Sequence, residues 1–280
     1  MAERVMVLTS ANGVSDRQVE MALTGLDADA PRRLSDCAVE VGVRGARPAV
    51  ALAEVDVNFV PVANREKKLL IADMDSTIIP VECIDELADF AGVKAQISKI
   101  TEAAMRGEMG FEESLEARVT LLKGLDEAAL ARAYAERISL NPGARVLVQA
   151  MNDRGAYTAL VSGGFTYFTE KVGADAGFAH TRANVLEMAD GVLSGTVRHP
   201  ILGREAKLEA MDELCAKRGI SRADVIAVGD GANDLAMIEG AGIGVAYKAK
   251  PALQAAADVV LDHSDLSAIL AIQGIGYSSS

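Results

Sequence analysis

Three short apolar runs, each followed at once by polar residues, constrain the fold of this chain more than any other feature. They are Leu69–Ala72 before Asp73-Met74-Asp75-Ser76-Thr77, Thr158–Val161 before Ser162-Gly163-Gly164, and Val225–Val228 before Gly229-Asp230-Gly231-Ala232-Asn233-Asp234. Short continuous apolar runs are typical of strands that are buried on both faces of a parallel sheet. Because parallel strands need long connections, the sequence predicts a sheet with helices between its strands.

Helical patterns fill the segments between these runs. The segment from Val81 to about Ile138 has no strand pattern and shows helical spacing only. The predicted fold is therefore an α/β doubly wound parallel sheet with a helical cap inserted after the first core strand, at about residues 81–140. Asp190-Gly191, between two apolar pairs, predicts a hairpin. The other expected elements are helices near 143–154, from about 165, at 204–218 and at 232–239, with strands at 156–161 and 224–228.

The first 64 residues have a different organisation. Residues 5–10 predict a strand, Ser15 predicts the cap of a helix that runs through Leu26, and residues 50–60 alternate apolar and polar side chains. The polar segment Asn64–Lys68 then separates this part from the first core strand. We therefore expect a small N-terminal αβ accessory module at 1–64 and a main domain at 65–280.

The charge balance limits the kinds of molecule that the protein is expected to bind. The chain has 28 basic and 40 acidic residues, a net charge of −12, which disfavours non-specific binding to nucleic acids or anionic membranes. No apolar run approaches the roughly 18 residues of a membrane span, and the first residues lack the pattern of a secretory signal. We expect a cytoplasmic protein that binds a small-molecule substrate. The sequence leaves open whether the protein forms a homodimer.

The polar residues after the apolar runs predict one site. Reactive groups of an open parallel sheet collect at the carboxyl ends of its strands, so Asp73, Asp75 and Asp230 are expected to approach one another. Carboxylates that lie so close together repel one another and need a cation between them. A small number of oxygen ligands suits Mg²⁺ better than zinc. Lys207 at the start of a helix, and backbone N–H groups after Ser162, could bind a phosphate group there.

The order of these residues resembles a known signature. Asp73-x-Asp75-x-Thr77, Ser162, Lys207 and Gly229-Asp230-x-x-x-Asp234 resemble the four motifs of haloacid dehalogenase-type phosphotransferases, over roughly residues 68–262. Within that superfamily the chain is most similar to phosphoserine phosphatases. This closer resemblance rests on Glu82-Cys83-Ile84-Asp85, Met105, Phe111-Glu112-Glu113-Ser114-Leu115 and Arg118-Val119. The N-terminal module resembles a shortened form of the regulatory ligand-binding module of some relatives.

The resemblance implies a reaction and roles. It implies hydrolysis of O-phospho-L-serine, the last step of serine biosynthesis, through a phosphorylated Asp73, with Asp75 as proton donor and acceptor. Mg²⁺ would bind the carboxylates of Asp73 and Asp230 and the backbone carbonyl of Asp75, with Asp234 close by. The implied substrate contacts are Glu82, Met105, Phe111, Arg118, Ser162, Gly163, Lys207 and Asn233. Without the resemblance, Met105, Phe111 and Arg118 would be read as helix packing with a surface charge.

Three alternatives stay open. The first is the same chemistry on another small phosphomonoester, or transfer of the phosphate to an alcohol such as homoserine. The second is a receiver domain, which also phosphorylates an aspartate but needs neither a second motif aspartate nor a cap. The third, a dinucleotide-binding oxidoreductase, lacks support because no Gly-x-Gly-x-x-Gly follows a strand.

Overall fold

The computed structural model describes residues 4–45, 50–106 and 108–278, without the side chain of Met105. In this part of the chain, six parallel strands form the main sheet in the order β13-β12-β11-β6-β7-β8. The strands are β6 Leu69–Ala72, β7 Tyr157–Phe165, β8 His180–Asn184, β11 Val225–Gly229, β12 Ile243–Tyr247 and β13 Val259–Leu261. The predicted α/β doubly wound parallel sheet is confirmed.

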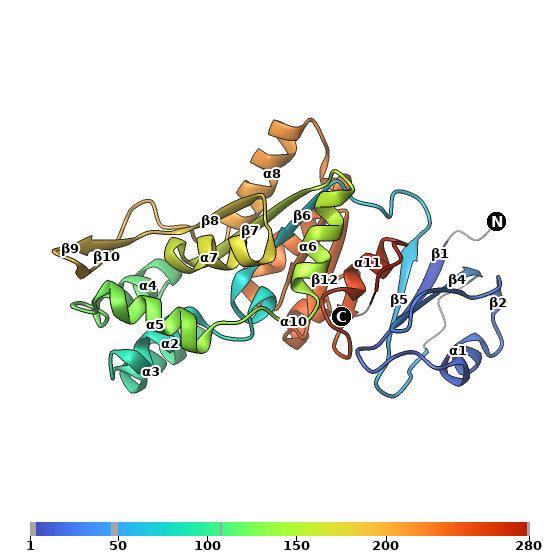
Figure 1. Cartoon of the computed structure of the whole chain (residues 1–280), viewed down its shortest axis with the longest axis horizontal. Coiled ribbons are helices and arrows are strands. Elements are labelled where there is room, and N and C mark those ends of the chain that lie inside the picture. The colour runs from blue at the N-terminus through green and yellow to red at the C-terminus, as the bar shows by residue number, and fades with distance from the viewer. Residues whose placement is uncertain (1–3, 46–49, 107, 279–280) are drawn as a thin grey trace.

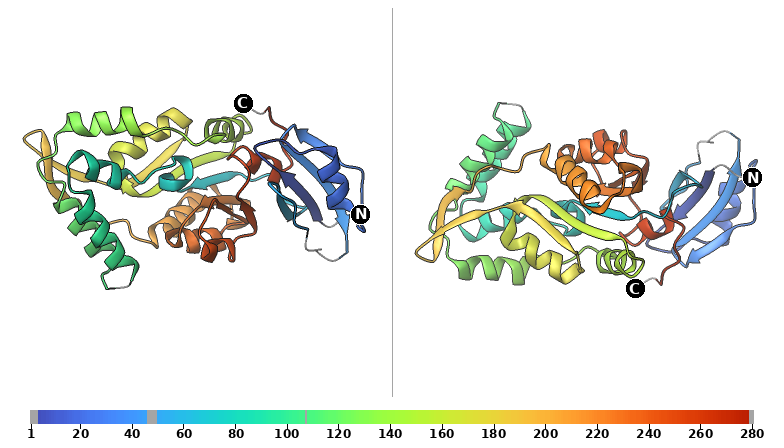
Figure 2. Two further views of the ribbon diagram at one scale, coloured as in Figure 1. Left: turned by 90° about the horizontal axis from the view of Figure 1, so that it is seen from below. Right: turned by 90° about the horizontal axis from the view of Figure 1, so that it is seen from above.

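Helices cover both faces of this sheet, as Figure 2 shows. Alternate residues of β6 face opposite sides: Leu70 and Ala72 pack with one group of helices, and Leu69 and Ile71 with the other. The first group is α6 Ala144–Asp153, α7 Thr166–Ala176 and α11 Ala268–Ile272. The second is α8 Ala206–Arg218, α9 Leu235–Gly240 and α10 Pro251–Gln254. Short helical turns are η1 Met74–Ile78, η2 Arg222–Asp224 and η3 Ala232–Asp234.

A helical cap follows the first core strand and extends beyond the carboxyl end of the sheet (Figure 1). Its helices are α2 Cys83–Phe90, α3 Lys94–Met105, α4 Phe111–Thr120 and α5 Glu127–Arg137. The hairpin of β9 Leu186–Ala189 and β10 Val192–Val197 turns at Asp190-Gly191, as expected. Leu193 exchanges backbone hydrogen bonds with Leu125 and Gly124, so the hairpin packs on the cap although it follows the core strand β8.

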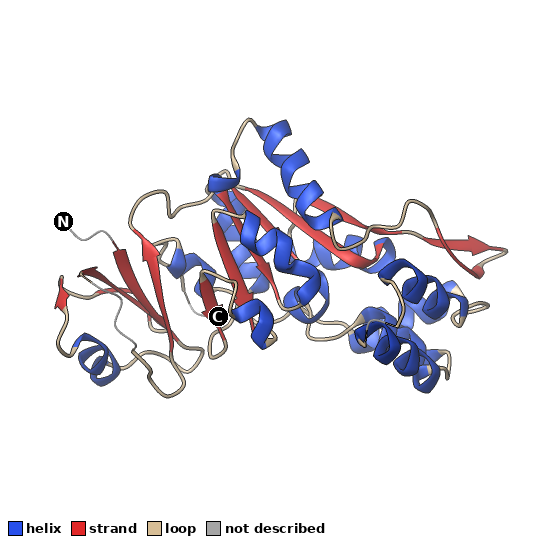
Figure 3. Cartoon of the chain, turned by 180° about the vertical axis from the view of Figure 1, so that it is seen from behind, coloured by secondary structure: helices blue, strands red, loops and turns tan. Residues whose placement is uncertain are grey.

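The N-terminal residues form a separate antiparallel sheet at the opposite end of the core from the cap (Figures 1 and 3). Its elements are β1 Arg4–Thr9, α1 Asp16–Leu23, β2 Asp27–Ala28, β3 Arg32–Ser35, β4 Ala38–Arg44 and β5 Asp56–Pro61. A capping box of Ser15 and Gln18 starts α1 as predicted, but the helix ends at Leu23, not Leu26. Gly25 takes a left-handed φ of 75° there, which favours a turn.

Polar side chains of β5 attach this sheet to the main one. The amide of Asn58 donates to the carbonyl of Val260 and accepts from its N–H, both at 2.9 Å. The buried Asp56 accepts from the N–H groups of Asp262 and His263. These side chains therefore supply hydrogen bonds that a further strand would give to the edge strand β13.

Candidate active site

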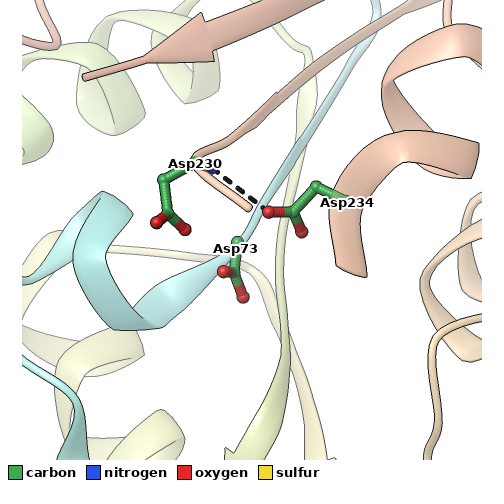
Figure 4. Close-up of side chains that lie close together, drawn as sticks. All are labelled: Asp73, Asp230 and Asp234. Atoms are coloured by element: carbon green, nitrogen blue, oxygen red, sulfur yellow. Dashed lines mark hydrogen bonds between the residues drawn. The ribbon is translucent and has the colours of Figure 1, made fainter. Parts of the chain in front are cut away.

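Two aspartates lie side by side because the strands that carry them are neighbours. Strands β6 and β11 pair with Ala72 opposite Val228, and the N–H of Asp73 donates to the carbonyl of Val228 at 3.0 Å. Carboxylate oxygens of Asp73, Asp230 and Asp234 lie within 4.8 Å of one another, in the one such acidic cluster among the described residues. Figure 4 shows the three side chains close together.

Asp234 and Lys207 fix one side of this cluster. One oxygen of Asp234 accepts from Lys207 Nζ at 2.5 Å, and the other accepts from the N–H groups of Asp230 and Gly231 at 3.1 and 3.0 Å. Lys207 Nζ also lies 2.6 Å from Asp73 Oδ1. A side chain at Gly229 would meet Asp234, since an added Cβ would lie 2.4 Å from its Cγ. Glycine at this position thus allows Asp234 to fold back on the loop.

The electrostatics of the cluster show an excess of negative charge. Burial, together with the charge of Asp234, raises the pKa of Asp73 well above its usual range, although Lys207 opposes the shift. Burial and the charges of Asp234 and Glu82 raise the pKa of Asp230 to about 6. Burial lowers the pKa of Lys207, but the charges of Asp234 and Asp73 outweigh it, so the pKa is raised. The lysine therefore stays charged and neutralises only part of the cluster.

A hard divalent cation fits these residues. The donors are carboxylate oxygens without His or Cys, which is the ligand set of such ions. Both oxygens of Asp234 already accept hydrogen bonds, whereas Asp230 keeps its carboxylate for an ion. Asp73 and Asp230 would thus hold the cation directly, with Asp234 orienting the loop and Lys207.

Asp75 points to a different set of partners. Its Oδ1 accepts from the N–H of Cys83 at 2.9 Å, and its Oδ2 accepts from the hydroxyl of Ser162 at 3.2 Å. Burial and the charge of Glu82 raise its pKa to about 6. A Cβ at Gly164 would lie 2.8 Å from Oδ2, so this approach of β7 to Asp75 requires glycine. The carboxyl of Asp75 could therefore gain or lose a proton near neutral pH beside the acidic cluster.

The Ser162-Gly163-Gly164 segment differs from its prediction in one respect. The strand was expected at residues 156–161, but β7 continues to Phe165, so the segment is extended up to the start of α7 at Thr166. The Ser162 hydroxyl accepts from the N–H of Gly164 at 2.8 Å while it donates to Asp75. The extended segment therefore places Ser162 beside the motif aspartates by strand geometry.

Asn184 is a residue that sequence reasoning missed. At the end of β8, its amide donates to the carbonyl of Gly163 at 2.8 Å and accepts from the N–H of Leu202 at 2.7 Å. It is 2% exposed, and it ties the end of β7 to the segment that leads into Lys207. The sequence offers no apolar run as a signal here, because β8 begins with the polar residues His180-Thr181-Arg182, so the strand was not recognised.

Three predicted contacts come from the cap side. Phe111, 38% exposed at the start of α4, lies 3.4 Å from the position of a Cβ on Gly163. Glu82 accepts from the Ser76 hydroxyl at 2.7 Å, and Ser76 has a left-handed φ of 56°. Arg118 is largely buried, which lowers its pKa against the opposing charges of Asp85 and Glu82, and its Nε donates to the carbonyl of Ser114. The cap thus closes over the end of β7.

Two predicted residues remain to be placed. Asn233 lies in η3, where its side-chain oxygen would be 2.4 Å from a Cβ on Gly231, so it folds over the Asp230 loop. Met105 ends α3, and its side chain lies outside the described part of the structure. The strand ends and the start of α8 thus bring together Asp73, Asp75, Ser162, Gly163, Lys207, Asp230 and Asp234.

Comparisons with known proteins agree with the resemblance of the sequence motifs. A family model described as haloacid dehalogenase-like hydrolase matches residues 70–239. A phosphoserine phosphatase of Polaromonas is 49% identical over 208 residues, 72% of this chain and 88% of the relative. One of Archaeoglobus fulgidus is 44% identical over 237 residues, 84% of this chain and 68% of the relative. A phospho-aspartyl intermediate analogue of a phosphoserine phosphatase superposes with a TM-score of 0.68 at 40% identity, covering 74% of this chain and 98% of that one.

Proposed function

Because this chain belongs to the haloacid dehalogenase-like hydrolases, and among them to the phosphoserine phosphatase family, we propose that it hydrolyses O-phospho-L-serine to L-serine and phosphate. The observation that carries the proposal is the acidic cluster of Asp73, Asp230 and Asp234 with Lys207 bound to two of its members. This arrangement supports attack of the Asp73 carboxylate on phosphorus. None of the helices that the structure describes has the length and apolar character needed to cross a bilayer.

Each residue has a task in this reaction. Lys207 holds Asp73 and neutralises a phosphate oxygen, while the Ser162 hydroxyl and the N–H of Gly163 bind the other oxygens. Asp73 displaces the serine oxygen and becomes an aspartyl-phosphate. Asp75 gives its proton to the departing oxygen, and its pKa of about 6 leaves part of its population protonated near neutral pH. Asp75 then accepts a proton from the water that attacks the phosphorylated Asp73.

Mg²⁺ is the proposed metal. Asp73 and Asp230 would hold it through carboxylates, and Asp75 through its backbone carbonyl, while Asp234 and Asn233 stand close to the ligands. When bound, it supplies positive charge that keeps Asp73 ionised and offsets the charge of the phosphate.

The cap provides selection for an amino acid. O-phosphoserine carries a carboxylate and an ammonium group besides its phosphate. Arg118 would bind the carboxylate in a bidentate manner, and Glu82 the ammonium group. Phe111 lies over Gly163, where it excludes water from the phosphate, and Met105 is proposed beside it.

The test is phosphate release by the purified full chain. With Mg²⁺, we expect rapid release from O-phosphoserine, much slower release from p-nitrophenyl phosphate, and loss of both after chelation. Adding Mg²⁺ back should restore the activity. A preference for a phosphomonoester without a carboxylate, or full activity after chelation, would contradict the proposal.

A further inference from the structure

A buried hydroxyl without a hydrogen-bond partner lies in the cap. Ser114 in α4 is 2% exposed, and its Oγ has no partner among the described residues. Leaving a buried hydroxyl unpaired costs about 1–3 kcal/mol, so such groups are rare in native proteins. In the described part of the chain, only Thr77 and Tyr247 share this condition. Stability therefore does not explain why a hydroxyl is present at residue 114.

Ser114 lies on the face of α4 that closes the site. Phe111, Ser114 and Arg118 are three and four residues apart, so they share one face of the helix. This face meets the phosphate-binding end of β7, because the ring of Phe111 lies 3.4 Å from the position of a Cβ on Gly163. The substrate would therefore bind along the strip that carries the unpaired hydroxyl.

Ser114 is also joined to Arg118. The carbonyl of Ser114 accepts from Arg118 Nε at 3.1 Å, which holds the stem of the guanidinium one turn from the hydroxyl. Arg118 makes no ion pair among the described residues, although the charges of Asp85 and Glu82 oppose the lowering of its pKa by burial. Both donors are therefore free to converge on one acceptor.

Packing alone does not account for the serine. Helix α4 packs against α3 and β10, and a small residue would allow close approach to either element. Alanine would allow the same approach without burying an unpaired hydroxyl. Packing therefore accounts for the size of the residue but not for its hydroxyl.

We propose that the Ser114 hydroxyl is a further substrate contact, which donates a hydrogen bond to the carboxylate of the phosphorylated amino acid beside Arg118. This inference rests on the proposed function. A carboxylate has acceptor sites for both donors, and its arrival would satisfy the hydroxyl that the free enzyme leaves unpaired. The residue would determine specificity without touching the reacting atoms.

The experiment compares Ser114→Ala with the wild-type full chain in the presence of Mg²⁺. We expect KM for O-phosphoserine to rise roughly tenfold, since a hydrogen bond to a charged group is lost. The kcat/KM for phosphoethanolamine, which has no carboxylate, should stay unchanged. The analogue 3-phosphooxypropanoate, which keeps the carboxylate and lacks the ammonium group, should show the same loss as O-phosphoserine. The melting temperature should not fall, because an unpaired group is removed.

Ser264→Ala is the matched control. Ser264 is buried as well, but its hydroxyl bonds to Asp56 and Thr9 at 2.6 and 2.7 Å, so this variant should melt at a lower temperature with KM unchanged. An unchanged KM for O-phosphoserine in Ser114→Ala, or equal losses on phosphoethanolamine, would overturn the proposal. A wild-type enzyme that fails to prefer O-phosphoserine over phosphoethanolamine would instead overturn the proposed function.

Discussion

At the scale of single residues, the site depends on side chains that have one hydrogen-bonding arrangement each. Asp234 uses both oxygens, and Lys207 contacts two carboxylates. Preorganised groups of this kind need no rearrangement when charge develops during the reaction. The residues that contact the proposed substrate from the cap, in contrast, keep unused donors.

Arg118→Ala tests the proposed selection for an amino acid. The variant should lose at least tenfold in kcat/KM on O-phosphoserine, because a charge-assisted contact with the substrate carboxylate is removed. Activity on p-nitrophenyl phosphate should change little, since that substrate has no carboxylate. Steady-state kinetics on the two substrates measure the difference. Equal losses on both would remove Arg118 from substrate selection.

Asn184→Asp tests the anchoring of Gly163. A carboxylate has nearly the same shape but does not donate to the Gly163 carbonyl, and it adds negative charge near a phosphate site. We expect kcat/KM on O-phosphoserine to fall about ten- to hundredfold, from the loss of roughly 1–3 kcal/mol. The control is Asn152→Asp, whose amide donates to the Gly177 carbonyl at 2.8 Å away from the site. Comparable kinetic losses in both variants would contradict a specific role for Asn184.

At the scale of elements, the predictions were right for strands whose burial follows from their hydrophobic pattern. The apolar run Leu69–Ala72 is buried on both faces, and so is the run Val225–Val228, as their composition predicted. The alternation near Asp56 and Asn58 predicted a strand, but its polar face is buried against β13. Sequence pattern does not tell solvent from a polar interface, because both accept hydrogen-bonding side chains.

Long-range contacts away from the predicted strand ends were not predicted. The hairpin at Asp190-Gly191 was expected from its turn, whereas its packing on the cap depends on Leu193 meeting Leu125. Strand β8 was missed because its pattern is polar, and Asn184 was missed with it. The proposed roles of Asp73, Asp75 and Lys207 were inferred from the order of the motifs along the chain.

Asn58→Leu tests the side-chain cover on strand β13. Leucine keeps the volume but leaves the N–H and carbonyl of Val260 unpaired, so we expect a loss of about 1–3 kcal/mol of unfolding free energy. Denaturant unfolding measures it. The control Asn12→Leu replaces an exposed asparagine in the turn that follows β1 and should be nearly neutral. Equal stability of the two variants would show that β13 does not depend on Asn58.

At the scale of the whole molecule, the N-terminal sheet and the cap lie at opposite ends of the core. The cap closes the site, while the N-terminal sheet attaches to the far edge strand. A buried ion pair of Arg65 and Glu40 at 2.9 Å reinforces that attachment. Hydrogen bonds and an ion pair thus join the N-terminal sheet to the rest of the chain.

Metal binding should affect the stability of the whole chain in a pH-dependent way. An unfolded aspartate ionises near 3.8, whereas Asp230 in the metal-free fold ionises near 6. Between these values the folded state retains a proton, so metal-free stability falls as the pH rises through this window. A bound cation favours the ionised carboxylate of Asp230 and therefore offsets this loss of stability.

We therefore expect Mg²⁺ to raise the melting temperature more at about pH 7.5 than at about pH 5. Differential scanning fluorimetry with and without the ion measures both increments. Asp230→Asn should abolish the increase, since it removes a carboxylate ligand. Equal increments at the two pH values would contradict the assignment of Mg²⁺ to this cluster.

The central claim is that Asp73 carries the phosphoryl group during turnover. The most direct measurement is acid quenching of the enzyme while it hydrolyses O-phosphoserine with Mg²⁺, followed by mass spectrometry of its peptides. We predict one phosphoryl group on the peptide that contains Asp73, and neither this label nor phosphate release in a folded Asp73→Asn variant. Rapid phosphate release with the label on another residue, or undiminished release by Asp73→Asn, would contradict the account.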